Sequence, residues 1–246
     1  MRGRPIPLSI PRRLVTDLMR FAIRVPTAPV HRRMKLGAVV AARTQRAERP
    51  PWTAIFAKGY AMVAQEVPEL RRAYLPYPWP HLYEYPISVA AIAVERDFAG
   101  ERAVFGCIIP DPLALPLEEI AAKIAHAAQA PINEIPDFRR ALHGGRLPLP
   151  IRRLLMWLAL NIGQQRGKYM GTFAIATLAS QGADSPNPLS VWTAALTYGM
   201  LDDDGEIDVR LTVDHRVLDG AISARVLARL EDTLNGPIAQ ELRGSS

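Results

Sequence analysis

A strand, a short polar turn and a helix follow one another near the end of the sequence, and this order constrains the fold more than any other feature. Residues 207–213 alternate between apolar and polar side chains, as in a half-buried strand, and 221–234 have the pattern of a helix. Between them lies Asp214-His215-Arg216-Val217-Leu218-Asp219-Gly220. A histidine at such a junction is suited to general-base chemistry, because the unperturbed pKa of histidine lies near working pH. The Asp219-Gly220 pair is expected to form a tight turn and to supply a carboxylate that orders the site.

The composition permits a full hydrophobic core and favours anionic partners. The chain has 246 residues, 49% apolar and 22% charged, enough for one large domain or two small ones. Its formal charge of +6 and pI of about 9.8 favour nucleic acid, phospholipid headgroups or a phosphate-bearing cofactor such as coenzyme A. The basic residues are scattered in pairs and accompany no RNA-binding motif, which argues against nucleic acid.

Other features exclude further classes. The single cysteine, Cys107, lies in an apolar segment; it excludes an internal disulfide and indicates a reducing, cytoplasmic setting. Prolines at positions 5, 7 and 11 interrupt any signal peptide, and the longest apolar run, 154–160, is much shorter than the ~20 residues of a membrane span. The histidines lack metal-ligand spacing, so no metal site is predicted.

The remaining pattern predicts one α+β domain, with a mixed sheet and helices on one face. Helices are expected at 12–23, 52–67, 117–128 and 151–162, and strands at 34–42, 87–94, 103–109, 172–178 and 191–200. Loops are expected at 76–86, 131–150 and 181–188, with Gly144-Gly145 as a turn. The organisation is then an extended arm at 1–11, a domain at 12–236 and a polar tail at 237–246.

Several of these segments occur in an order that resembles a known family. They are residues 53–59, 67–70, 89–94, 116–120, 171–175, 193–198 and 214–220. Between about Arg12 and Leu234 the sequence is similar to the catalytic domain of the dihydrolipoyl acyltransferases of 2-oxoacid dehydrogenase complexes, which share a fold with chloramphenicol acetyltransferase. The resemblance implies a two-layer α/β sandwich that assembles as a homotrimer, with active sites between subunits.

The resemblance also implies a mechanism. His215 Nε2 would remove a proton from a thiol, hydroxyl or amine acceptor, which then attacks the thioester of an acyl-coenzyme A. Asp219 would order the site by pairing with Arg13 of the first helix, while Asp214 and Gly220 support the turn. A hydroxyl donor would face the developing oxyanion, as acyl transfer requires.

Three departures from the family pattern leave alternatives open. Ala176 stands where the family has its oxyanion serine; Thr177 is the neighbouring candidate, although consecutive strand side chains face opposite ways. The chain has no lipoyl domain, and the polar residues 240–246 replace the family's apolar tail that docks trimers into cages, so a freestanding trimer is expected. The helix at 151–162 is more apolar than the family pattern and is predicted as a buried lid, a trimer contact or a peripheral membrane helix.

The sequence therefore predicts a cytoplasmic acyl-CoA-dependent acyltransferase that acts on a small or lipid-like acceptor. His215 is its general base, Asp219 orders the site and Thr177 is the candidate oxyanion donor. The alternative is a trimeric scaffold of the same fold in which Ala176 has impaired catalysis, with or without membrane contact.

Overall fold

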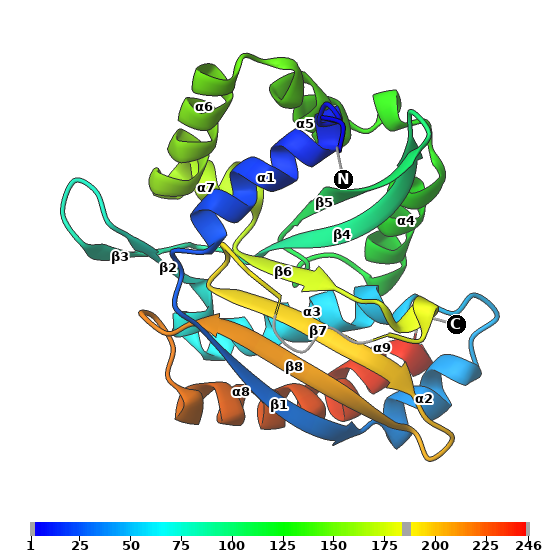
Figure 1. The fold of residues 1–246 in the computed structure, drawn as a ribbon. Helices are drawn as coiled ribbons and strands as arrows, with labels where there is room; N and C mark the ends of the chain where they lie inside the picture. Colours follow the sequence, from blue (N-terminus) through cyan, green and yellow to red (C-terminus); the bar gives the residue numbers. More distant parts are fainter. Residues whose placement is uncertain (1–2, 184–187, 245–246) are drawn as a thin grey trace.

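The computed structural model describes residues 3–183 and 188–244, and its centre is a mixed six-stranded sheet (Figure 1). The sheet order is β1-β8-β7-β6-β4-β5, with β4–β6 and β6–β7 parallel and the other neighbours antiparallel. Its strands are β1 (Thr27–Lys35), β4 (Val89–Phe98), β5 (Glu101–Pro110), β6 (Phe173–Ala176), β7 (Ala194–Leu201) and β8 (Glu206–Asp214), and a separate hairpin joins β2 (Arg72–Leu75) to β3 (His81–Glu84). The predicted α/β class with a mixed sheet is confirmed.

The helices lie in two groups (Figure 1). The first group packs on one face of the sheet and consists of α2 (Gly37–Thr44), α3 (Trp52–Glu66), α4 (Leu117–Gln129), α8 (Gly220–Thr233) and α9 (Ala239–Gly244). The second gathers at the β4–β5 end and consists of α1 (Ile10–Ala22), α5 (Pro136–Arg146), α6 (Leu149–Asn161) and α7 (Gly163–Met170). Within the part of the chain that the structure describes, no helix is long and apolar enough to cross a membrane.

Alternation along the strands decides which side chains enter the main core. Successive strand side chains point to opposite faces, so every second residue of each central strand meets the first helix group. Phe173 stacks on Tyr60 of α3 with ring centroids 3.9 Å apart, and Tyr198 stacks on Phe56 at 4.6 Å. The α3 helix is buried along most of its length, because its apolar residues occur on all sides.

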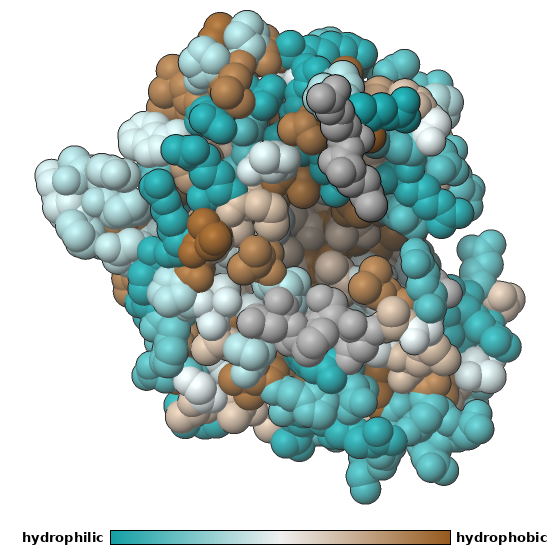
Figure 2. Space-filling model, viewed as in Figure 1, coloured by the Kyte–Doolittle hydropathy of each residue, from teal (hydrophilic) through white to brown (hydrophobic). Residues whose placement is uncertain are grey.

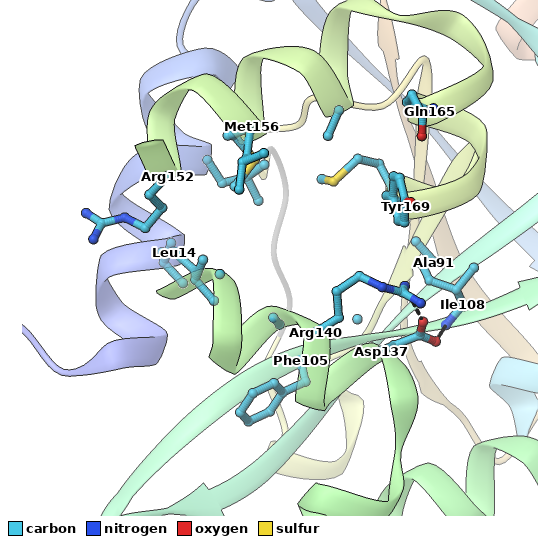
Figure 3. A pocket seen from close by; sticks show the side chains of 18 of the residues that line it. Leu14, Ala91, Phe105, Ile108, Asp137, Arg140, Arg152, Met156, Gln165 and Tyr169 are labelled. Atoms are coloured by element: carbon cyan, nitrogen blue, oxygen red, sulfur yellow. Dashed lines mark hydrogen bonds and ion pairs between the residues drawn. The ribbon is translucent and has the colours of Figure 1, made fainter. Parts of the chain in front are cut away.

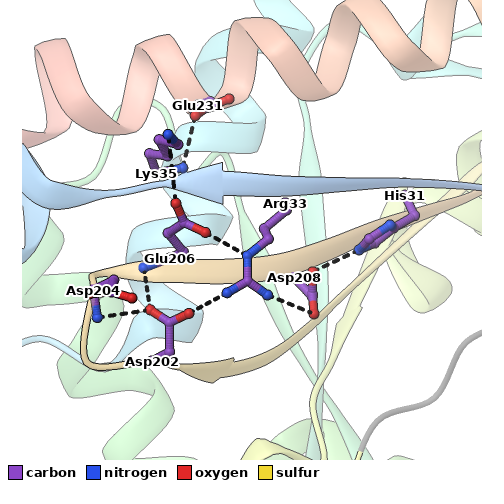
Figure 4. A network of polar contacts seen from close by, with 8 residues as sticks. All are labelled: His31, Arg33, Lys35, Asp202, Asp204, Glu206, Asp208 and Glu231. Carbon is purple, nitrogen blue, oxygen red and sulfur yellow. Dashed lines mark hydrogen bonds and ion pairs between the residues drawn. The ribbon is translucent and has the colours of Figure 1, made fainter.

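The edge strand β1 is held to β8 by charged side chains (Figure 4). Arg33 lies among the carboxylates of Asp202, Glu206 and Asp208, with its Nε 2.5 Å from Glu206. The hydrogen bond to Glu206 raises the pKa of Arg33. His31 Nε2 lies 2.9 Å from Asp208. Charged side chains on an edge strand discourage pairing with another sheet, so this network both secures β1 and protects the edge.

The other predicted helices and strands are confirmed within a few residues, but two expectations for the first half of the chain are wrong. The strand predicted at 34–42 is the end of β1 followed by α2. The reason is that β1 is a charged strand stabilised by acidic residues of its partner, which a local apolar pattern does not reveal. The loop expected at 76–86 contains β3, because pairing with β2 satisfies its backbone groups.

The proline-rich segment 131–150 is also different from the expectation. Most of it forms α5, which includes the Gly144-Gly145 pair that was predicted as a turn. A Cβ at Gly145 would lie 2.6 Å from Ile10 Cγ2, so this glycine permits close approach of α1. The helix α7, which the pattern did not predict, follows α6 directly.

Helices extend into the two segments that were expected to flank the domain. Ser9 caps α1 through a hydrogen bond from Arg12 N–H, so the arm ends before residue 10. The expected polar tail is helical up to Gly244, with Leu242 buried and Glu241 bound to Lys58 Nζ at 2.6 Å. Parts of three predicted segments lie outside the described residues, namely 1–2 of the arm, 184–187 of the loop and 245–246 of the tail.

Candidate active site

The turn between β8 and α8 is closed by hydrogen bonds around the buried carboxylate of Asp214. That carboxylate accepts two hydrogen bonds from the Arg216 guanidinium, at 2.9 and 2.7 Å, and one from the Arg216 backbone N–H at 3.0 Å. The Asp214 carbonyl accepts hydrogen bonds from the N–H groups of Val217 and Leu218. A bidentate arginine–carboxylate pair fixes geometry as well as charge. Asp214 therefore tethers the turn to the end of β8.

His215 stands at the start of this turn, with 55% of its side chain exposed. Its backbone N–H donates to the Pro26 carbonyl at 2.9 Å. Ring Nδ1 lies 3.1 Å from the Leu218 carbonyl, an arrangement that assigns the proton of the neutral ring to Nδ1, because a carbonyl can only accept. The ring then has an unprotonated Nε2, which is the nitrogen that a general base uses to accept a proton.

Asp219 caps α8 with its backbone and leaves its side chain free for the histidine. The Asp219 carbonyl accepts hydrogen bonds from the N–H and hydroxyl of Ser223 at 3.0 and 2.9 Å. Its carboxylate is 75% exposed and lies 4.0 Å from His215 Nδ1. Gly220 begins α8 with an ordinary right-handed backbone, and a Cβ there meets no atom within 4 Å. Within one chain, this position therefore does not require glycine.

The structure does not bring Arg13 and Asp219 together. Arg13 Nε donates to a backbone carbonyl of the preceding arm at 3.0 Å, and among the described residues no ion pair joins it to Asp219. The ion pair of α1 is formed instead by Asp17, which is 1% exposed and pairs with Arg152 and Arg153 of α6. Asp17 therefore attaches α1 to α6.

Thr177 follows the last residue of β6, at the opposite end of the sheet from His215 (Figure 1). Its hydroxyl donates to the Tyr198 carbonyl at 3.0 Å and accepts from a backbone N–H two residues further on. Ala176 lies in the cross-strand row that contains Arg210 of β8. At ~3.3 Å per strand residue, the five steps from Arg210 to His215 span roughly 17 Å. A single chain therefore does not place Ala176 or Thr177 beside His215.

Two polar residues near the turn were not predicted. Arg166 of α7 is buried, and burial lowers the pKa of its guanidinium, an effect that Tyr85 and Asp214 oppose. Thr212, three residues before His215, is fully buried, and its hydroxyl has no hydrogen-bond partner among the described residues. A threonine inside an apolar strand was the only sequence signal for Thr212, and nothing local distinguishes Arg166 from the surface arginines.

The turn thus offers one basic nitrogen and one exposed carboxylate, with no nucleophile of its own. In the described ranges, 3–183 and 188–244, no group of three His, Cys, Asp or Glu side chains is placed to hold a metal ion. The chemistry that this geometry supports is proton transfer to and from a bound substrate.

Comparisons with known proteins identify the fold. No protein-family model matches the sequence, and no curated protein matches it. Solved structures do match. A dihydrolipoamide acetyltransferase of Azotobacter vinelandii is 18% identical, with 98% of this chain and 94% of that chain covered and a TM-score of 0.68. A truncated catalytic core of a 2-oxoacid dehydrogenase complex from Thermoplasma acidophilum is 20% identical, with coverage of 96% and 99% and a TM-score of 0.65.

Chloramphenicol acetyltransferase matches as well, at 13% identity, with coverage of 92% of this chain and 98% of that chain and a TM-score of 0.55. The chain therefore has the fold of these acyltransferase catalytic cores, and the resemblance noted from the sequence is confirmed at the level of the fold. The Azotobacter vinelandii structure was studied for the role of a serine, a histidine and an asparagine in its catalytic mechanism, and that histidine and asparagine are four residues apart.

Proposed function

We propose that this chain is the catalytic unit of an acyltransferase, which moves an acyl group from a coenzyme A thioester to a thiol, hydroxyl or amine. The observation that carries the proposal is the His215 ring, whose Nδ1 is bound to the Leu218 carbonyl. This contact leaves the basic Nε2 on a ring that is more than half exposed. The fold, shared with acyltransferase cores, supports the same reaction class.

The proposed reaction moves one proton out and back. His215 Nε2 takes the proton of the acceptor, and the acceptor attacks the thioester carbonyl carbon to form a tetrahedral oxyanion. When this intermediate collapses, the carbon–sulfur bond breaks and the imidazolium returns the proton to the coenzyme A sulfur. The Asp219 carboxylate, 4.0 Å from Nδ1, favours the transient positive charge on the ring.

The spacing of the two residues gives further support. His215 and Asp219 are four positions apart, as are the histidine and asparagine of the Azotobacter vinelandii enzyme. Here an acid stands in place of the amide, so this chain adds a negative charge beside the imidazole. We infer that the exposed Asp219 carboxylate orders the ring; the pairing of Asp219 with Arg13 stays a prediction.

We also propose that the complete site lies between two copies of the chain in a homotrimer. Thr177 and Ala176 lie at the far end of the sheet from His215. A neighbouring subunit that presents its β6 end to His215 would bring them into reach. The basic charge of the chain suits the phosphates of coenzyme A as a substrate.

The alternative function is a trimeric scaffold of the same fold. It is favoured by Ala176, which cannot donate a hydrogen bond from its side chain, and by the Thr177 hydroxyl, which is already engaged at both its donor and acceptor positions. The loss of one oxyanion donor typically costs ~10²–10³ in rate. Contact of 151–162 with a membrane surface remains part of this alternative.

The test is the release of free coenzyme A from a panel of acyl-CoA donors and acceptors, followed by chromatography. His215→Ala is expected to lower the rate ~10²–10⁴-fold, the usual contribution of a general base. His31→Ala is the matched control, because His31 is an exposed histidine of β1 that is paired with the Asp208 carboxylate of β8, away from the turn. Release at full rate by His215→Ala removes this residue from the mechanism. No release from any donor, by a chain that remains trimeric in light scattering, supports the scaffold.

A further inference from the structure

A cavity of about 580 Å³ lies between the second helix group and the outer side of β5 (Figure 3). Its volume is within the ~300–1,000 Å³ typical of small-molecule sites. The walls come from α1, α5, α6 and α7, together with residues of β4 and β5 and Trp192 before β7. On the face seen in Figure 2, apolar surface gathers where the molecule is hollowed between these helices and the lower strands.

Small residues keep this cavity open. Gly106 of β5 and Gly144 of α5 both line it, and a Cβ at either position would meet no atom within 4 Å. Neither glycine has a left-handed backbone, so the chain conformation does not require glycine at these positions. Ala91, Ala141 and Ala159 also line the space. The sequence thus leaves out side chains that the fold has room for, which makes the cavity suited to an occupant.

Each charged residue of the lining has an ion-pair partner, so the apolar part of the cavity does not require a charged ligand group. Arg152 points away from the open space (Figure 3) and binds the buried Asp17. Asp137 accepts a hydrogen bond from Arg140 at 3.0 Å and one from the Ile108 N–H at 3.1 Å. The remaining lining is mostly apolar. An apolar chain satisfies such a cavity, because it loses contact with water without leaving a polar group unpaired.

Tyr169 lines the cavity and is 36% exposed, so we take it to mark the mouth, and the side chains around it carry an excess of positive charge. Arg140 and Lys168 both lie against the Tyr169 ring, at 5.1 and 5.3 Å from its centroid. Because the Asp137 carboxylate pairs with Arg140 at 3.0 Å, the net positive charge comes from Lys168, which lies next to the lining residue Tyr169. An anionic head group is therefore favoured at this mouth.

The polypeptide chain connects two walls of the cavity to the His215 turn. Trp192 lines it, and the carbonyl of the next residue, Thr193, accepts the Asp214 N–H at 2.9 Å. On another side, the helix α1 leads to Pro26, whose carbonyl accepts the His215 N–H. Two walls of the cavity are thus connected through short backbone paths to the residues that hold the candidate base.

We propose that this cavity binds the aliphatic chain of an anionic amphiphile, with the chain among α1, α5 and α6 and the head at the Tyr169 mouth. If the chain is the proposed acyltransferase, medium- and long-chain acyl compounds are then its substrate class, and this part of the proposal rests on the proposed function. The binding itself does not depend on turnover.

The test begins with the affinity of the full chain for octanoate, decanoate and dodecanoate, measured by calorimetry. Affinity is expected to rise about fourfold with each added methylene, since each one removes apolar surface from water. Dodecanol, which lacks the charge, is expected to bind more weakly than dodecanoate. Equal affinity along the series, or no binding at all, overturns the proposal.

Two variants fill the cavity from different elements. Gly106→Leu and Gly144→Leu are each expected to weaken dodecanoate binding at least tenfold. Gly37→Leu is the matched control, because a Cβ at Gly37 also meets no atom within 4 Å and this residue lies outside the lining. Circular dichroism confirms the fold of each variant. Wild-type affinity in both folded cavity variants contradicts the proposal.

Competition experiments distinguish whether the aliphatic chain in the cavity belongs to the acyl donor or to the acceptor. Dodecanoate that competes with dodecanoyl-CoA assigns the cavity to the acyl donor, and dodecanoate that competes only with the acceptor assigns it to the acceptor; both support the cavity. His215→Ala is expected to bind dodecanoate like the wild type. Binding without any acyl transfer leaves the cavity proposal standing and rejects the enzyme, whereas transfer without dodecanoate binding does the reverse.

Discussion

The His215 turn and the cavity beside α6 are built in opposite ways. The turn is closed by hydrogen bonds among residues 214–223, which are near neighbours in the sequence. The cavity is made by side chains that extend from residue 11 to residue 192, and it stays open because several of them are small. A proton-transfer group needs a fixed local geometry, whereas the space for a substrate comes from elements that meet only in the folded chain.

The two regions also differ in polarity. The His215 ring and the Asp219 carboxylate face solvent, whereas the cavity is lined mostly by apolar side chains between helices. The candidate base is therefore presented outward, where a substrate or another copy of the chain can reach it. The following predictions test how firmly each region depends on the residues named.

The largest effect on stability is expected from Asp214→Ala in the turn. The change leaves the Arg216 guanidinium, which lies 4.3 Å from the centre of the Tyr74 ring, without its carboxylate. Removing one partner of a buried ion pair costs ~3–5 kcal/mol, and we expect about 3 kcal/mol because Arg216 is 32% exposed. Urea denaturation measures the free energy of unfolding. Asp219→Ala, which removes an exposed carboxylate, is the control and is expected to change stability little. Equal stability of the two variants contradicts the conclusion that Asp214 tethers the turn to β8.

A smaller effect is expected where α5 meets α1 at the cavity wall. Gly145→Leu drives a side chain into Ile10 and is expected to lower the free energy of unfolding by ~1–3 kcal/mol, as overpacking does. Gly144→Leu is the matched control in the same helix, because its side chain enters open space. Replacing a helical glycine also adds helix propensity, so Gly144→Leu is expected to unfold at the same temperature or higher. If Gly144→Leu melts at a lower temperature than Gly145→Leu, Gly145 is not the residue that permits the close approach of α1.

The smallest effect concerns Cys107, on the face of β5 that is turned away from the cavity. Burial raises the pKa of this thiol from 9.0 to about 11. Between these values the unfolded chain loses a proton that the folded chain keeps, so stability falls as pH rises. Between pH 8 and pH 10, the free energy of unfolding is expected to fall by roughly 1 kcal/mol less in Cys107→Val than in the wild type. Urea denaturation at the two pH values measures the free energy of unfolding. An identical decrease in wild type and variant shows that burial does not raise the pKa of this thiol.

Much of the fold was predictable because its signals are local. Helix α3 is apolar throughout and ends before a proline, and β4 and β5 are joined by turn residues, so both were predicted near their observed bounds. Strand β1 was missed because it is polar, and its stability comes from β8, more than 170 residues away in the sequence. Helix α5 was missed because its glycines indicated a turn, while their reason is the packing of α1 and the opening of the cavity.

The sequence by itself determined the seven-residue turn that carries His215, because a strand, a short polar segment and a helix specify their connection through neighbours alone. It also determined the order of segments that led to the acyltransferase fold. Only the tertiary structure decided that Asp17 of α1 pairs with Arg152 and Arg153 of α6, and that Thr177 lies at the far end of the sheet from His215 within one chain. The tertiary structure also decided that α1, α5, α6 and α7 leave a cavity between them. These features depend on strand register and helix packing between distant residues, and no local pattern encodes such distances.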